Sequence, residues 1–298
     1  VAKKGINVPE VYTKAYACYA LKCAIAPDIP NNTASLAPFE ITAPIGSILN
    51  APHPAPVALR HVIGHMIPDT VYGALDQLLP ATVPAEGAGS LCNFMVSLRP
   101  RTDLQAPDSA ERAEVLAFNS GGSGARPTSD GLSATAFPSG VMTMPVEATE
   151  NTGPVLIWRK ELRPDSGGAG TYRGGLGQFM EVGAMEGHEF DFQAMFDRVE
   201  HPARGRQGGF NGAATTIARD DQVKMRGKGK QFVPHGRRVL LAFPGGAGYG
   251  DPLLRDRALV RQDLARGYIS ADVAKSEYGL SEQDVQDVMT AVKQGNFN

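Results

Sequence analysis

Two histidines and an aspartate recur at helical spacing in the first quarter of the chain. His61, His65 and Asp69 stand at positions i, i+4 and i+8, so an unbroken helix would place them in one polar stripe that could bind a divalent metal or relay a proton. Pro68 is expected to kink that helix just before Asp69, and Arg60 offers the aspartate a partner. Two roles therefore stay open for these three residues. They are either hydrogen-bonded structural side chains or a catalytic or metal-binding site.

A glycine-rich run that begins at Gly121 places Arg126 and Asp130 in a second candidate loop. Closely approaching backbone amides and an arginine fork together could hold an anion. The run does not lie between a clear strand and a clear helix, so a tight turn with Arg126 bound to an acidic neighbour is the alternative. The candidate catalytic residues are His61, Asp69, Arg126 and Asp130.

Two further glycine blocks lie downstream, DSGGAGTYRGGLGQ from Asp165 and PGGAGYGDP from Pro244. The first carries charges of both signs, including Arg173, and is compatible with a functional loop, a subunit interface or an internal salt-bridged turn. The second lacks the Lys-Ser/Thr pair of a nucleotide-binding P-loop. We therefore expect no cofactor-binding residues in this chain.

The pattern of apolar residues predicts an α+β fold. Residues 11–25 and 57–79 have helical periodicity, short β-like runs separated by glycine and proline fill the middle, and capping patterns at Asp251 and Ser281 predict small terminal helices. We expect amino-terminal helices packed on a β-rich body with a helical tail. The expected divisions are a helical and Pro-rich segment over 1–92, a β-rich body over 93–250 and the tail over 251–298, all within one compact unit.

Composition narrows the functional classes. A net charge of −2 with scattered Lys and Arg argues against nucleic acid as a partner, and no apolar run has the length of a membrane span. Cys18, Cys23 and Cys92 have no metal-ligand spacing, which favours reduced thiols in the cytoplasm.

The order of several blocks resembles a known family. Read together, APIGSILNAPHPAPVALRH from Ala43, DGLSATAFPSG from Asp130, PVEATE from Pro145 and the closing GYGDPLLRD resemble the carboxy-terminal half of the hydantoinase B / 5-oxoprolinase family, with N-methylhydantoinase B-like subunits among its members. The resemblance covers roughly residues 10 to 280, and its specificity lies in the ordered series. Arg60-His61 and Asp69 fit the family pattern.

The resemblance implies ATP-dependent hydrolysis of a cyclic amide such as a hydantoin or 5-oxoproline. ATP would bind a hydantoinase A-like partner subunit, and a divalent metal would be bound mainly by the amino-terminal half of the subunit. Since Val1 corresponds to the middle of family members, either the chain is a fragment or processed product, or a partner chain supplies that half. Hetero-oligomeric assembly follows from this reading.

Two alternatives stay open. One is an alpha-type subunit of an acetone or acetophenone carboxylase-like enzyme, because such subunits share the resemblance. The other is a non-catalytic assembly half that docks the catalytic domains. A cleft lined by the four candidate residues would argue against the second alternative, since side chains must converge to act together.

Overall fold

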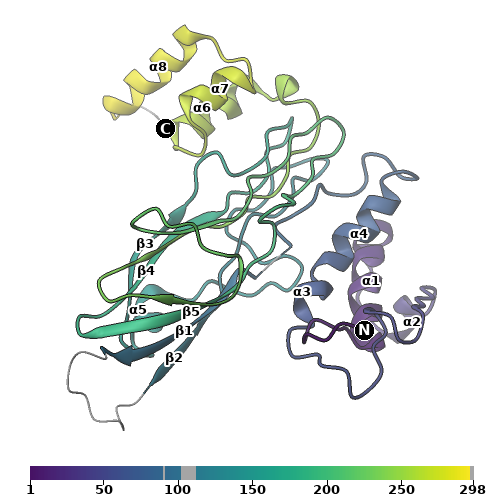
Figure 1. The fold of residues 1–298 in the computed structure, drawn as a ribbon. Helices are drawn as coiled ribbons and strands as arrows, with labels where there is room; N and C mark the ends of the chain where they lie inside the picture. Colours follow the sequence, from purple (N-terminus) through teal and green to yellow (C-terminus); the bar gives the residue numbers. More distant parts are fainter. Residues whose placement is uncertain (90, 102–111, 296–298) are drawn as a thin grey trace. The chain divides into compact units, whose positions relative to one another are not determined.

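In the computed structural model, residues 1–89, 91–101 and 112–295 are described (Figure 1). They divide into two compact units, Val1–Pro84 and Ala85–Asn298. With 24% helix and 20% strand, and with helices and strands in separate stretches of the chain, the α+β prediction is confirmed. The finer division at residues 92 and 250 stays a prediction.

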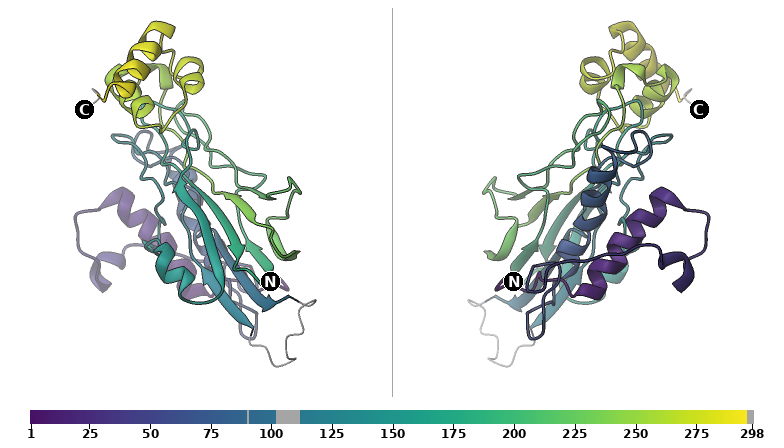
Figure 2. Two further views of the ribbon diagram at one scale, coloured as in Figure 1. Left: turned by 90° about the vertical axis from the view of Figure 1, so that its left-hand side faces the viewer. Right: turned by 90° about the vertical axis from the view of Figure 1, so that its right-hand side faces the viewer.

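The first unit is helical. It contains α1 (Glu10–Ile25), α2 (Thr33–Leu36), α3 (His61–Gly64) and α4 (Met66–Leu75). Helix α1 runs beside α4 (Figures 1 and 2). A glycine permits the close approach of α1 to α3, because a Cβ atom at Gly64 would lie 2.4 Å from Cε1 of Tyr12.

The helix predicted over residues 57–79 is interrupted near Pro68, as its missing N–H group predicts, but the break does not fall at Pro68 itself. The helix is interrupted three residues earlier, at His65, which ends α3 and precedes α4. Pro68 then falls in the first turn of α4. Backbone N–H groups of a first turn have no intrahelical partner, so proline costs little there.

The second unit contains a pair of antiparallel sheets. The strands are β1 (Asn93–Pro100), β2 (Ala113–Ala117), β3 (Val155–Leu162), β4 (Gln178–Ala184), β5 (His188–Met195), β6 (Thr216–Arg219), β7 (Lys228–Val233) and β8 (Val239–Ala242), and the short helix α5 (Val146–Glu150) precedes β3. One sheet has the order β2-β1-β5-β7 and the other β3-β4-β8-β6. Strand β7 escaped prediction because its sequence, KGKQFV, is polar and mostly exposed.

The core of this unit is built from the inward faces of both sheets. Val96 on β1 lies opposite Phe192 on β5, and Met180 on β4 lies opposite Leu241 on β8. All four belong to one buried apolar cluster. Alternation along each strand therefore places one apolar row in a shared core, as in a β-sandwich.

The glycine blocks form a close-packed set of extended segments beside the sheets. Their backbones exchange hydrogen bonds between segments, for example Gly175 N to Ser123 O and Gly246 N to Gly175 O, both 2.9 Å. A Cβ atom at Gly246 would lie only 1.8 Å from the Ser123 carbonyl oxygen, and one at Gly122 would lie 1.8 Å from that of Gly175. These glycines are required for backbone-to-backbone packing.

The tail folds over the glycine blocks within the same unit. It contains the 3-10 helix η1 (Pro252–Leu254), α6 (Arg257–Ala265), α7 (Ala271–Ser276) and α8 (Glu282–Lys293), which gather together in both views of Figure 2. The predicted caps are confirmed: Asp251 accepts from Leu253 N, and Ser281 accepts from Asp284 N. No helix in the described residues is long and apolar enough to cross a membrane.

Candidate functional site

His61 and His65 of the first unit lie close together at the junction of α3 and α4. Their ring centroids are 6.2 Å apart and meet edge to face, and His65 also lies 5.9 Å from the ring of Tyr16 on α1. His65 is 2% exposed. Burial, reinforced by the neighbouring His61, lowers the pKa of His65 to about 4. The imidazole of His65 is therefore neutral near pH 7.

A stripe of tyrosines on α1 faces these histidines. The rings of Tyr12 and Tyr16 stack at 4.7 Å, and their hydroxyl groups form a 3.2 Å hydrogen bond. Burial and this hydrogen bond raise the pKa of Tyr16. The i, i+4 spacing of the tyrosines was visible in the sequence but indicated only an apolar stripe. The structure adds that the ring of Tyr16 lies next to that of His65.

Asp69 occupies the next turn of α4 and is 7% exposed. Burial, together with nearby Cys23, Tyr19 and the Asp69 carboxylate, raises the pKa of Tyr72. Within the described part of the chain, no group of three or more His, Cys, Asp or Glu side chains is arranged to hold a metal ion. The metal set His61, His65 and Asp69 thus remains a prediction from spacing.

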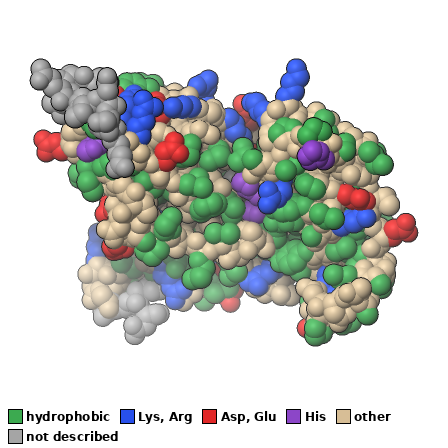
Figure 3. Space-filling model, turned by 90° about the horizontal axis from the view of Figure 1, so that it is seen from below, with side chains coloured by type: hydrophobic (Ala, Val, Ile, Leu, Met, Phe, Trp, Pro, Cys, Tyr) green, Lys and Arg blue, Asp and Glu red, His purple; other side chains and the backbone are tan. Residues whose placement is uncertain are grey.

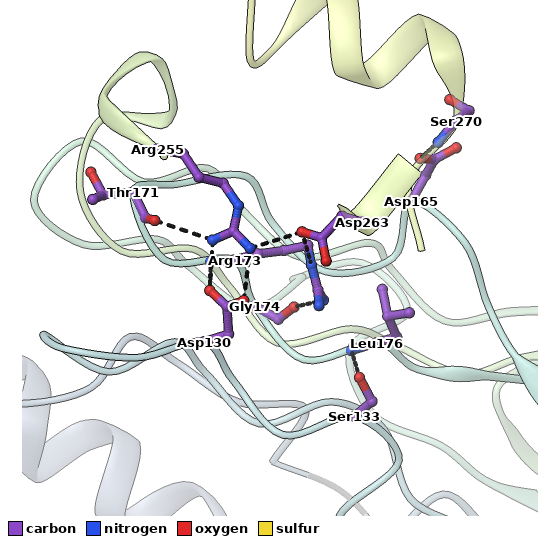
Figure 4. A network of polar contacts seen from close by, with 10 residues as sticks. All are labelled: Asp130, Ser133, Asp165, Thr171, Arg173, Gly174, Leu176, Arg255, Asp263 and Ser270. Carbon is purple, nitrogen blue, oxygen red and sulfur yellow. Dashed lines mark hydrogen bonds and ion pairs between the residues drawn. The ribbon is translucent and has the colours of Figure 1, made fainter. Parts of the chain in front are cut away.

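In the second unit, Asp130 joins a network of four charged side chains (Figure 4). Arg255 binds both carboxylate oxygens of Asp130 at 2.7 Å and donates a third bond to Asp263 at 2.8 Å. Arg173 donates its backbone N–H to Asp130 at 2.8 Å and its Nε to Asp263 at 3.1 Å. The network connects the glycine blocks to the tail, since Arg255 and Asp263 belong to the latter.

This network of charged side chains is largely buried. The Arg255 side chain is 1% exposed and that of Asp263 8%, whereas Asp130 keeps 31%. Burial opposes ionisation of Asp130, but the hydrogen bonds and charge of Arg255 outweigh it and lower the pKa of this carboxyl. Both oxygens of Asp130 are thus already bound. Its predicted role as a free catalytic acid or base gains no support from this geometry.

Arg126 behaves differently. Its side chain is exposed, and its Nη2 donates to the Asp130 carbonyl at 3.0 Å. Its backbone closes a turn with Ser129. The backbone at Arg126 therefore forms the tight turn that was the alternative prediction. The guanidinium, however, binds a backbone carbonyl and not an acidic side chain.

A second buried carboxylate, Glu86, is also bound by two arginine side chains. It accepts from Arg198 Nη1 at 3.0 Å and from Arg204 Nε at 2.7 Å. Burial opposes ionisation of Glu86, but the hydrogen bonds from Arg204 lower its pKa. Sequence reasoning found neither this cluster nor the partners Arg255 and Asp263, because residues far apart in the chain carry no signal of contact.

The four candidate catalytic residues fall in different compact units. His61 and Asp69 belong to Val1–Pro84, whereas Arg126 and Asp130 belong to Ala85–Asn298. The structure brings together His61 with His65, and Arg126 with Asp130.

An α+β fold with interlocked glycine segments and this order of motifs defines a family of enzyme subunits. The chain belongs to the hydantoinase B/oxoprolinase family, whose model matches residues 1–252. It is 32% identical over 277 residues to an uncharacterized protein of Methanocaldococcus jannaschii, covering 92% of this chain and 47% of that protein. It is 31% identical over 249 residues to the caprolactamase subunit beta of Pseudomonas jessenii, covering 80% and 42%.

A solved structure agrees. The ATP-dependent caprolactamase from Pseudomonas jessenii matches with a TM-score of 0.76 at 26% identity, over 96% of this chain and 52% of that chain. The chain spans about half the length of the curated relatives it matches.

Proposed function

We propose that this chain is part of a subunit of an ATP-dependent cyclic-amide hydrolase that acts on rings of the hydantoin, 5-oxoproline or lactam type. The observation that carries the proposal is family membership over residues 1–252, joined by likeness to an ATP-dependent caprolactamase along nearly the whole chain. In this assembly the other half of the subunit and an ATP-binding, hydantoinase A-like subunit are the partners. The cytoplasm is the proposed compartment.

The need for ATP follows from amide chemistry. Resonance makes the carbonyl of a ring amide a poor electrophile, so water opens the ring slowly. Transfer of a phosphoryl group to the amide oxygen would convert that oxygen into a leaving group and make the carbon electrophilic. Water then adds to the carbon and the C–N bond breaks, with a proton supplied to the nitrogen, which leaves an acyl phosphate. A second water attacks the carbonyl carbon of this acyl phosphate, and phosphate departs with the former amide oxygen.

ATP does not fit the glycine blocks of this chain. Phosphate-binding glycines leave space for the ligand beside their amides. Here a Cβ atom at Gly245 would lie 1.7 Å from the Ser166 carbonyl oxygen, so backbone already occupies that space. We therefore assign nucleotide binding to the partner subunit. We likewise propose, as the family resemblance implies, that a divalent metal binds mainly in the other half of the subunit.

The roles proposed for this half are narrower. His61 and Asp69 are the candidates for proton transfer, with neutral His65 beside them. Arg126 is the candidate for contact with an anionic group. Asp130, with both oxygens bound by Arg255, is proposed to hold the loop instead of reacting.

The test is reconstitution with both partners. The assembly is incubated with ATP and a panel of hydantoin, 5-oxoproline and caprolactam, and ADP release and ring opening are measured together. The proposal expects ring opening that depends on ATP and on this chain. ADP release only with a ketone plus bicarbonate would instead indicate the carboxylase alternative. Full activity without this chain would overturn the proposal.

A further inference from the structure

The guanidinium of Arg126 is held at one point and otherwise open. Its Nη2 donates to the carbonyl oxygen of Asp130 at 3.0 Å, and the side chain is exposed. Among the residues that the structure describes, no carboxylate forms an ion pair with it. The other N–H donors of the fork therefore face solvent and are available to a ligand.

The loop that carries Arg126 is fixed at both ends. Ala125 N donates to Ala247 O at 2.9 Å, and Gly131 N donates to Arg173 O at 2.8 Å. Between these ends, the Asp130 carboxylate is held by the Arg255 fork. Figure 4 shows Arg255 reaching from the tail to Asp130. These anchors fix the backbone from which the Arg126 side chain extends, so the loop itself does not have to be ordered when a ligand binds.

The balance of charge around Arg126 also favours binding of an anion. Within the network, Arg173 and Arg255 are balanced by Asp130 and Asp263. Arg126 adds a positive charge that no acidic side chain of the network neutralises. Planar guanidinium groups match carboxylate and phosphoryl oxygens in two parallel hydrogen bonds.

We propose that Arg126 binds a carboxylate or phosphoryl group of a ligand, and that Arg255, from the tail, is the positioning residue that aims it by gripping Asp130. The identity of the ligand rests on the proposed function, since phosphoryl groups and ring carboxylates are the anions of that reaction. The tail thereby contributes to ligand binding without touching the ligand.

Binding to the full chain is measured by isothermal titration and by NMR of the arginine side-chain N–H groups. The probes are inorganic phosphate and 5-oxoproline, which carries a carboxylate, and hydantoin serves as the uncharged comparison. We expect the two anions to bind and hydantoin to bind far more weakly. If phosphate alone binds, the phosphoryl source is indicated, and if 5-oxoproline alone binds, the carboxylate source is indicated. Absence of binding by both anions would overturn the proposal.

Substitutions distinguish the residue that contacts the ligand from the residue that positions it. Arg126→Gln should weaken anion binding on the order of tenfold without changing the unfolding temperature, because the residue is exposed. Arg237→Gln, another exposed arginine, is the matched control and should leave binding unchanged. Unchanged affinity in Arg126→Gln, or an equal loss in the control, would overturn the assignment of Arg126.

Arg255→Lys keeps the positive charge but removes the bidentate hydrogen bonds to the Asp130 carboxylate. If the variant is folded by circular dichroism, its affinity should fall several-fold while the Arg126 N–H signals shift in the free protein. Asp130→Asn provides a second route if the first variant unfolds. Wild-type affinity in a folded variant would refute the positioning role. These readouts do not use turnover, so their failure is distinguishable from failure of the proposed reaction.

Discussion

Replacing Arg255 with methionine tests how far the buried network stabilises the tail. The change removes the guanidinium that binds Asp130 and Asp263 but keeps a long side chain in a site where the arginine is 1% exposed. Breaking a buried pair by removing one partner costs about 3–5 kcal/mol, because the remaining charge stays buried. Two features reduce this cost here: Asp263 keeps Arg173, and Asp130 keeps partial exposure to solvent.

We therefore expect the loss to lie near the lower limit, about 3 kcal/mol. For a domain of this size, that loss lowers the unfolding temperature by roughly 6–12 °C. Thermal unfolding gives the magnitude, and hydrogen exchange of the amides in α6 to α8 shows whether the tail loses protection first.

The matched control is Arg261→Met in the same tail. Arg261 pairs with Asp284 at 2.9 Å, but both side chains are more than a third exposed. Such surface pairs contribute about 0–1 kcal/mol. If Arg255→Met and Arg261→Met lower stability by the same small amount, the reasoning from burial is refuted.

Three further outcomes are expected. Gly64→Ala should destabilise the first unit by about 1–3 kcal/mol, because its Cβ would lie 2.4 Å from Tyr12 Cε1; combining it with Tyr12→Ala should recover part of the loss in urea unfolding. Gly246→Ala should prevent folding of the second unit, because its Cβ would meet the Ser123 carbonyl at 1.8 Å; a folded variant with a native circular dichroism spectrum would contradict the packing argument. The pKa of Asp130 is lowered from its ordinary value of 3.8, so its contribution is complete above that value and is lost as pH falls through the folded-state pKa. Thermal unfolding at pH 3 and pH 7 should differ less in Asp130→Asn than in the wild type, and an equal difference would refute this linkage.

Local patterns predicted most of the elements. The period of apolar residues placed α1 and all strands except β7, and capping residues placed the starts of η1 and α8. Strand β7 lacks an apolar pattern because its first three residues are exposed, and it is a strand through its pairing with β5. Intrinsic propensity therefore predicted the elements whose burial agrees with the local sequence pattern. It did not predict a strand whose structure depends on pairing with a neighbouring strand.

The candidate site was less accessible to sequence reasoning. The i, i+4 spacing correctly placed His61 near His65, because helical geometry fixes that distance. The partner of Asp130 is Arg255, 125 residues away, and no local pattern connects the two. The glycine blocks suggested shaped loops, but only the three-dimensional structure shows that neighbouring backbone lies where the Cβ atoms of most of these residues would be.

The most direct test of the central claim follows the amide oxygen. A ring amide labelled with ¹⁸O at its carbonyl is incubated with ATP and the assembly that contains this chain, and the released phosphate is analysed by mass spectrometry. Activation of the amide by phosphoryl transfer predicts that the label appears in phosphate, and that both label transfer and ring opening stop when this chain is omitted. Label that remains in the ring-opened carboxylate, or transfer that continues without this chain, would contradict the account.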